Sequence, residues 1–118
     1  MIEKTATAIL DAGATIIRQS GRGRLLVVKG PDRGDSIAIH ESAVTVGSGS
    51  GCDVVLSDPT ISRRHLGVEP GAAGVVLRDL GSTNGTFLNG QRITSPQWVN
   101  DGDLIRCGLN TQFKLRME

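Results

Sequence analysis

Short apolar runs separated by turn residues occupy the chain from Leu25 onward. Runs rich in valine, isoleucine and leucine, bounded by glycine, proline and asparagine, are typical of β-strands joined by turns. The breaks leave no room for a helix of ordinary length. The pattern therefore predicts an all-β sandwich of about ten or eleven short, mostly antiparallel strands. The apolar runs are LLVVKG, DSIAIH, AVTVG, VVLS, HLGVEP, VVLRDL, TFLN, LIRCG and FKLRM.

The first part of the chain has a different pattern. Its apolar pairs at 9–10 and 16–17 are interrupted by polar residues, and the loop-like SGRGR follows at 20–24. We interpret residues 1–24 as an N-terminal arm with one or two possible strands, and residues 25–118 as the folded domain.

Length and charge narrow the classes of function. A chain of 118 residues makes one domain, and 13 Lys and Arg against 12 Asp and Glu give a net charge of +1. This charge excludes the strongly basic signature of a general nucleic-acid-binding domain. The aromatic residues Trp98, Phe87 and Phe113 are too few for a base-stacking platform. We expect no direct contact with nucleic acid.

The chain has no pattern that predicts export, a membrane span or a metal site. Glu3 and Asp11 lie where a signal peptide is uncharged, and no apolar run approaches the roughly 18 residues of a membrane helix. Cys52 and Cys107 lack zinc or redox spacing, so we interpret them as reduced, buried cysteines. We expect a cytoplasmic protein that contacts no membrane and needs no cofactor.

Three loops concentrate glycine and hydrogen-bonding side chains between the predicted strands. They cover residues 47–53, 58–65 and 81–86. Loops of a sandwich gather at its two ends, so these three are expected to form one binding edge. Their hydroxyls, amides and backbone N–H groups, with the guanidinium groups of Arg63 and Arg64, suit a phosphate oxyanion.

Enzymatic interpretations of the same residues are weaker. The glycines of 47–51 are followed by a predicted strand, whereas nucleotide-binding glycine loops open a helix. Ser62 as nucleophile with His65 as base lacks the nucleophile-elbow pattern, and a serine three residues before a histidine is more often a local turn. Ser62 can also simply cap a turn, and Asn84 can serve a left-handed backbone. We expect no catalysis.

The segments VTVGSGSGCDVVLSDPTISRRHLGV, LRDLGSTNGTFLNGQRI and DGDLIRCG resemble the forkhead-associated (FHA) domain, a phosphothreonine-binding β-sandwich. The resemblance runs from Val44 to Gly108. Gly47-Ser48 together with DPTISRRHL and DLGSTNGTFLNG is similar to the N-terminal FHA domains of bacterial sigma-54-dependent transcription activators.

The resemblance implies roles for individual residues. Ser62 would donate its hydroxyl to the phosphate and Arg63 would add a charge-assisted contact, both of which their chemistry permits. Asn84 would hold the peptide backbone, and Thr83 would belong to the same surface. By alternation from Arg63, Arg64 is expected to point elsewhere, as a solvated charge or a strut.

Other residues would support the site or depart from the family pattern. His65 and Gly85 would hold the loops, and Gly47 would let the chain turn. Ser48 stands where the family usually has an arginine that binds phosphate. Ser48 can still form a hydrogen bond, but without the charge-assisted bond the affinity falls by roughly ten- to a hundredfold, or about 1.5–3 kcal/mol.

The sequence thus predicts a phosphothreonine-peptide recognition module that acts downstream of a Ser/Thr kinase. The alternative is a phosphate-independent docking or dimerisation module that lost its ligand with the arginine. A basic group near the arm is typical of a solvated face, though it can contact an acidic partner. This group consists of Arg18, Arg22, Arg24, Lys29 and Arg33.

Overall fold

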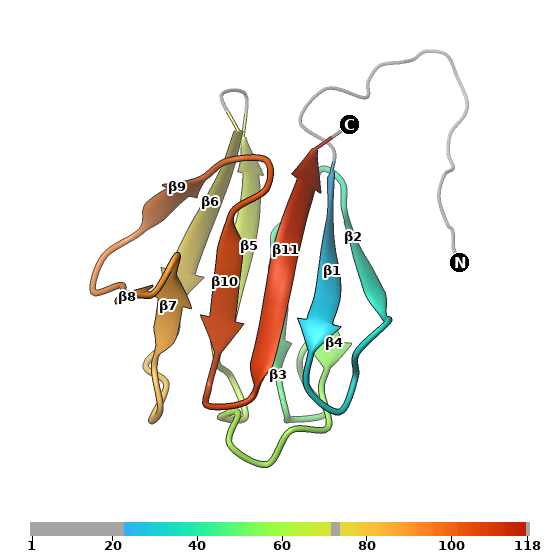
Figure 1. The fold of residues 1–118 in the computed structure, drawn as a ribbon, viewed down its shortest axis with the longest axis vertical. Coiled ribbons are helices and arrows are strands. Elements are labelled where there is room, and N and C mark those ends of the chain that lie inside the picture. Colours follow the sequence, from blue (N-terminus) through green and yellow to red (C-terminus); the bar gives the residue numbers. More distant parts are fainter. Residues whose placement is uncertain (1–22, 72–73, 118) are drawn as a thin grey trace.

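The computed structural model describes residues 23–71 and 74–117, which form a two-layered sandwich of strands (Figure 1). No helix in these two ranges is long and apolar enough to cross a membrane. The predicted all-β fold is confirmed. The eleven strands of the described residues are β1 (Gly23–Lys29), β2 (Ser36–Ile39), β3 (Val44–Gly47), β4 (Val54–Val55), β5 (Leu66–Gly71), β6 (Gly74–Asp79), β7 (Thr86–Leu88), β8 (Gln91–Arg92), β9 (Gln97–Val99), β10 (Leu104–Cys107) and β11 (Thr111–Met117).

The strands form two sheets. The first has the order β2-β1-β11-β10-β7-β8, and the second has the order β4-β3-β5-β6-β9. Within the described residues, neighbouring strands pair antiparallel except for β3 and β4, which are parallel. The mostly antiparallel arrangement is therefore as the sequence predicts.

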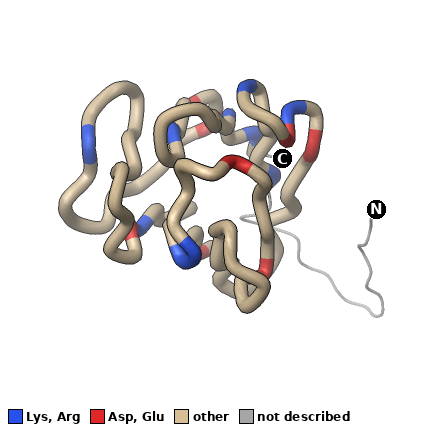
Figure 2. The backbone as a smooth tube through the Cα atoms, turned by 90° about the horizontal axis from the view of Figure 1, so that it is seen from below, with Lys and Arg blue, Asp and Glu red and all other residues tan. Residues whose placement is uncertain are grey.

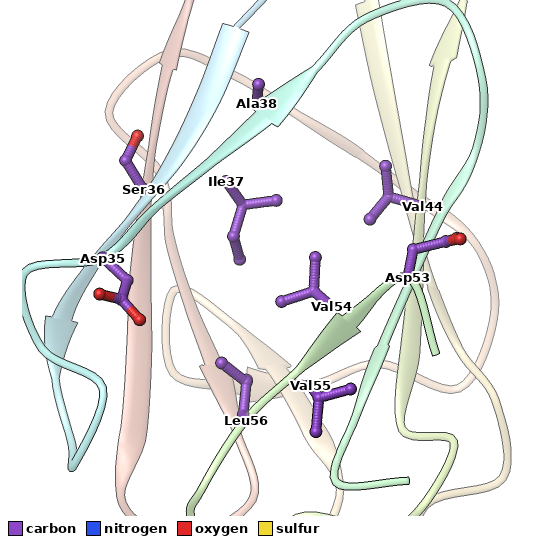
Figure 3. Close-up of a pocket in the computed structure, with 9 residues that line it drawn as sticks. All are labelled: Asp35, Ser36, Ile37, Ala38, Val44, Asp53, Val54, Val55 and Leu56. Carbon is purple, nitrogen blue, oxygen red and sulfur yellow. The ribbon is translucent and has the colours of Figure 1, made fainter. Parts of the chain in front are cut away.

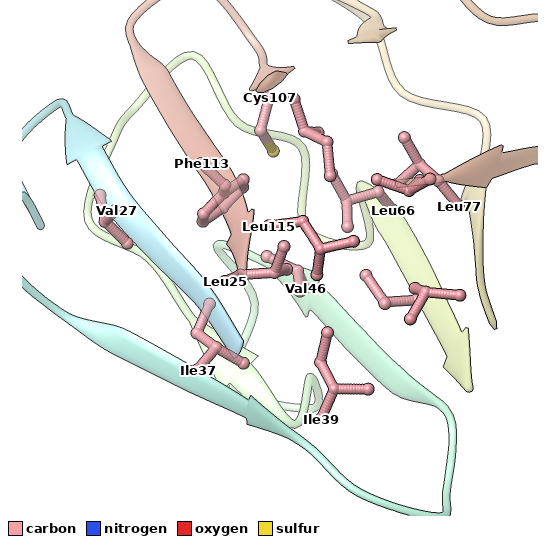
Figure 4. Packing of buried hydrophobic residues seen from close by; sticks show 14 of the residues in the cluster. Leu25, Val27, Ile37, Ile39, Val46, Leu66, Leu77, Cys107, Phe113 and Leu115 are labelled. Atoms are coloured by element: carbon pink, nitrogen blue, oxygen red, sulfur yellow. The ribbon is translucent and has the colours of Figure 1, made fainter. Parts of the chain in front are cut away.

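The core lies between the sheets and follows the alternation of each strand. Leu25 and Val27 of β1 point inward, and Phe113 and Leu115 of β11 stand beside them, while the residues between them face outward. Side chains of the second sheet, such as Leu66, meet them from the other side (Figure 4). Each such burial stabilises the fold by about 1.5–3 kcal/mol. Because a shift of one residue would turn these side chains toward solvent, their burial also sets the register of the strands.

The three predicted loops lie at one end of the sandwich, and the start of β1 and the end of β11 lie at the other (Figure 1). The connections that follow β1, β3, β4, β6 and β10 lie at the lower end in Figure 1, whereas β1 begins and β11 ends at the upper end. Gly23 pairs with Met117 across β1 and β11, so the first strand begins before the predicted domain start at Leu25. The rest of the predicted arm lies outside the described residues.

The hairpin between β7 and β8 turns at Asn89 and Gly90. Their φ angles are 50° and 89°, so both occupy the left-handed region that a two-residue hairpin of this kind requires. Asparagine and glycine tolerate that region, which explains why this dipeptide predicts the turn from sequence.

Candidate functional site

Backbone hydrogen bonds fix the first predicted loop, residues 47–53, along the second. The Ser48 amide donates to the Ser62 carbonyl at 3.0 Å, and the Gly49 amide donates to the Arg63 carbonyl at 3.1 Å. A Cβ atom placed on Gly47 would lie 2.1 Å from the Arg63 carbonyl oxygen. Gly47 is thus required for this close approach and not, as expected, to let the chain turn. Its φ angle is not in the left-handed region.

The two cysteines are free thiols in different surroundings. Cys107 is buried as predicted, and its pKa is raised by burial and, to a smaller extent, by the charges of Asp58 and Asp79. Cys52 is only half-buried, which corrects the expectation of a buried side chain. Its position is set by a polar contact, because its thiol donates to the Arg63 carbonyl at 2.8 Å.

His65 joins the second loop, residues 58–65, to the third, residues 81–86. It is fully buried, its Nδ1 accepts from the Ser62 amide at 3.0 Å, and its Nε2 lies 2.8 Å from the Gly85 carbonyl oxygen. These partners place the ring proton on Nε2, which donates to Gly85. The imidazole therefore holds Ser62 by its backbone, and neither ring nitrogen is directed at the Ser62 hydroxyl as a general base would be.

The Ser62 hydroxyl has a fixed oxygen and an uncommitted proton. Its Oγ accepts from the Thr83 amide at 3.0 Å, and the described residues supply no acceptor for its proton. Asn84 reaches the same second loop, because its Nδ2 donates to the Thr60 carbonyl at 2.9 Å. Ser62, Thr83 and Asn84, predicted to share a surface, lie together here.

Arg63 and Ser48 flank Ser62 in different ways. Arg63 is exposed and forms no ion pair or side-chain hydrogen bond with the residues that the structure describes. Ser48 is half-buried and its hydroxyl donates to the Ile61 carbonyl of the second loop at 2.9 Å. Seen from below, the backbone has both basic and acidic positions (Figure 2). Arg63 thus follows Ser62 directly in sequence and has an exposed side chain.

Comparison with known proteins decides the family. Residues 26–118 match a family model described as "Inner membrane component of T3SS, cytoplasmic domain". An FHA domain-containing protein of Arabidopsis thaliana is 39% identical over 94 residues, 76% of this chain and 24% of that protein. A solved structure from an analysis of phosphothreonine-dependent FHA domain interactions is 30% identical with a TM-score of 0.73, covering 82% of this chain and 97% of that one. The chain belongs to the FHA domain family.

A second relative covers more of the chain. An oxoglutarate dehydrogenase inhibitor of Corynebacterium diphtheriae is 30% identical over 107 residues, which are 91% of this chain and 74% of that protein. The FHA domain described here spans only about a quarter of the Arabidopsis relative. The resemblance to FHA domains is thus confirmed, whereas the narrower resemblance to those of sigma-54-dependent activators stays a prediction.

Asp58 anchors the second loop of this FHA domain, although sequence reasoning gave it no role. Its fully buried carboxylate accepts from the Thr60 amide at 2.9 Å, from the Thr60 and Thr111 hydroxyls at 2.8 Å and from Asn110 Nδ2 at 3.1 Å. Burial alone raises the pKa of Asp58, but the hydrogen bonds from Thr60, Thr111 and Asn110 outweigh it, so the pKa is lowered. Asp58 stays ionised at neutral pH.

Asp79 anchors the third loop of the FHA domain. Its carboxylate accepts from the Gly81 and Ser82 amides at 3.0 and 3.1 Å, from the Ser82 hydroxyl, and from the Thr86 hydroxyl at 2.7 Å. Burial raises its pKa, and the hydrogen bonds, led by that of the Ser82 hydroxyl, lower it further than burial raises it. The signal in the sequence was an aspartate two or three residues before Ser, Thr or Gly, the pattern of an Asx turn.

A groove lies elsewhere on the FHA domain, between edge strands β2 and β4 (Figure 3). It has a volume of about 480 Å³ and an apolar floor that includes Ile37, Val54 and Leu56, with Asp35 and Asp53 among its polar lining residues. Thr45 donates its backbone amide and its hydroxyl to Asp53, which lowers the pKa of that carboxylate. None of the predicted site residues lines this groove. In the described parts of the chain, no three His, Cys, Asp or Glu side chains are grouped to hold a metal ion.

Proposed function

We propose that this FHA domain recognises phosphothreonine peptides without catalysing a reaction. The observation that carries the proposal is the Ser62 hydroxyl. Its oxygen is held by the Thr83 amide and its proton is uncommitted among the described residues, and the exposed Arg63 follows it in sequence. A fixed hydroxyl donor, followed in sequence by an exposed guanidinium, is suited to a phosphate dianion.

Asn84 supplies a second kind of contact in this proposal. One hydrogen of its side-chain amide is used by the Thr60 carbonyl, which fixes the orientation of the group. The remaining hydrogen and the side-chain carbonyl can then bind one peptide unit of the partner. Thr83 is exposed beside it and extends the same surface. The phosphate and the peptide backbone would thus be read by neighbouring residues of two loops.

Ser48 weakens the proposed phosphate site and favours the alternative function. It contributes no charge, and the donation of its hydroxyl proton to the Ile61 carbonyl leaves it able to accept hydrogen bonds but not to donate one to a phosphate. The alternative is a docking or dimerisation module that does not need phosphate. The two functions differ in whether affinity depends on the phosphoryl group.

Calorimetry with a matched pair of threonine and phosphothreonine peptides tests the proposal. We expect the phosphopeptide alone to bind measurably. Ser62→Ala and Arg63→Ala should each reduce its affinity by roughly ten- to a hundredfold, the range of a lost charge-assisted hydrogen bond. Arg64→Ala is the matched control, because Arg64 is also exposed in the same loop and should change affinity little. Equal affinities for both peptides would establish the alternative.

The wider setting is part of the same proposal. The domain would be cytoplasmic, would act downstream of a Ser/Thr kinase, and would regulate a sigma-54-dependent transcription activator without itself contacting nucleic acid. The support is the Gly47-Ser48 pair with DPTISRRHL and DLGSTNGTFLNG. In a full-length protein that joins this domain to an ATPase domain, phosphopeptide should change the ATPase rate, and Ser62→Ala should abolish the change. An ATPase rate that stays unchanged when phosphopeptide is bound would contradict the regulatory role in a sigma-54-dependent activator. It would not contradict recognition of the phosphopeptide.

A further inference from the structure

One face of the domain is basic although the whole chain is almost neutral. The strands of the first sheet, β2-β1-β11-β10-β7-β8, contain six basic residues and no acidic residue. All six are exposed or half-buried, so they lie on the outer surface of the sheet, which we call the basic face. They are Arg24, Lys29, Arg92, Arg106, Lys114 and Arg116.

Strand register gathers half of these cations into one row. Residues paired across the sheet follow the order Arg92, Phe87, Arg106, Gln112, Lys29, from β8 to β1. The cations occupy alternate strands, about 10 Å apart from one to the next. The Arg106 guanidinium lies 3.9 Å from the centre of the Phe87 ring, which holds it in place through a cation–π contact.

Above that row, apolar side chains flank a lysine. Leu26, Lys114 and Leu104 are paired across β1, β11 and β10, and Leu104 is 41% exposed. Arg116 follows Lys114 on the same side of β11, about 7 Å further along the strand, and is paired with Arg24. The basic face therefore presents cations and accessible leucines together.

We propose that the basic face binds an acidic protein segment that also carries apolar side chains. Carboxylates of such a segment complement the cations, and its apolar residues cover Leu26 and Leu104. Two acids are hydrogen-bonded to the last residues of β11 at the upper end of the face: Asp101, whose Oδ1 accepts from the Met117 amide at 2.7 Å, and Asp103, whose backbone carbonyl accepts from the Leu115 amide at 3.0 Å. They limit the surface at that end.

A nucleic acid fits this face less well than a polypeptide. Single-stranded nucleic acids stack their bases on aromatic rings, but one side of Phe87 is occupied by Arg106. The exposed Trp98 belongs to β9, in the other sheet. The inference uses neither Ser62 nor a phosphate, so it is independent of the proposed function.

The test measures binding of an unphosphorylated peptide of repeated Glu-Glu-Leu, with Gln-Gln-Leu as the neutral control. The double variant Lys114→Glu, Arg116→Glu should bind the acidic peptide with an affinity that is lower by about tenfold or more. This loss of affinity should become smaller as the salt concentration rises. Arg64→Glu with Arg78→Glu is the matched control, because both residues are exposed and lie outside this sheet, and the charge change is identical. Lys114→Gln with Arg116→Gln gives a smaller loss in the same direction and replaces the first pair if that pair unfolds.

Three results would overturn the inference. Equal losses from both charge-reversed pairs would mean that only net charge matters. Tighter binding to phosphatidylserine vesicles or to DNA of matched charge would assign the face to another partner. Failure of the acidic peptide to bind at low salt would mean that the basic face does not bind acidic segments. Amide chemical shifts that change at Leu104 and Lys114, and not in the loops, would support the proposed position.

Discussion

Substitution of His65 should reveal how strongly the loops depend on one buried ring. His65→Ala removes the acceptor of the Ser62 amide and the donor to the Gly85 carbonyl. The Gly85 carbonyl keeps a partner, because the Gly108 amide also donates to it at 3.1 Å, whereas the Ser62 amide does not. An unpaired amide and the cavity left by the ring together cost about 2–4 kcal/mol, which lowers the melting temperature of a domain of this size by about 10 °C or more.

Two further variants separate the two hydrogen bonds. In His65→Asn, the side-chain oxygen can take the place of Nδ1 and accept from Ser62, while the bond to Gly85 is lost. In His65→Gln, the side-chain nitrogen can take the place of Nε2 and donate to Gly85, while the Ser62 amide is left unpaired. Because only Gly85 has a second partner, Gly108, the Asn variant should be more stable than the Gln variant, and both more stable than the Ala variant.

Urea unfolding followed by far-UV circular dichroism measures this order. Ser62→Ala and Asn84→Ala are the controls, because each removes one hydrogen bond from a half-buried side chain and should cost about 0.5–1.5 kcal/mol. A Gln variant as stable as the Asn variant, or a melting temperature of the Ala variant within about 2 °C of the parent, would refute this account of the ring.

Three other perturbations have clear expected outcomes. The pKa of Asp58 is lowered in the folded domain, so the stabilisation that its carboxylate provides is complete above the unfolded pKa of about 3.9 and is lost as pH falls through the folded pKa. Asp58→Asn should be less stable than the parent at pH 7. In urea unfolding from pH 7 to pH 3, its free energy of unfolding should decline less than that of the parent. Gly47→Ala should cost about 2 kcal/mol or more in the same assay, since its Cβ meets the Arg63 carbonyl oxygen at 2.1 Å; a change below about 0.5 kcal/mol would mean that the loop yields freely. Ser48→Arg should raise phosphopeptide affinity by about 1–2 kcal/mol, less in added salt and little for the unphosphorylated peptide; calorimetry that shows no gain would mean that position 48 faces away from the phosphate.

Alternation and turn chemistry were sufficient to predict most of the strands, although β8 and β9 contain none of the apolar runs. The β7–β8 hairpin at Asn89 and Gly90 shows why, because the φ angles that the turn needs are a local property of those two residues. The three loops were expected at one edge because the loops of a sandwich gather at its ends, whereas the choice of Ser62, Thr83 and Asn84 within them came from the family resemblance. Ser62 is 21 or more positions from the other two, so only the tertiary fold joins them.

Contacts between distant parts of the chain account for what was not predicted. Asp58 binds Thr111, 53 positions away, and only the position of the β10–β11 turn beside the second loop makes that possible. Ser48 points inward because its acceptor is the Ile61 carbonyl of another loop. Similarly, alternation places Arg92 on an outer surface, but strand order decides that it shares a row with Arg106.

The direct pairing of Gly23 with Met117 has a mechanical consequence. They are the first residue of β1 and the last residue of β11, at the end of the sandwich opposite the three predicted loops (Figure 1), so tension applied through them acts across β1 and β11 rather than along them. The hydrogen bonds between these strands are then loaded one after another, as in a zipper, instead of all together in shear. Under a pulling force the domain should open from this end first, at low force, while the loop end is the last part to feel the load.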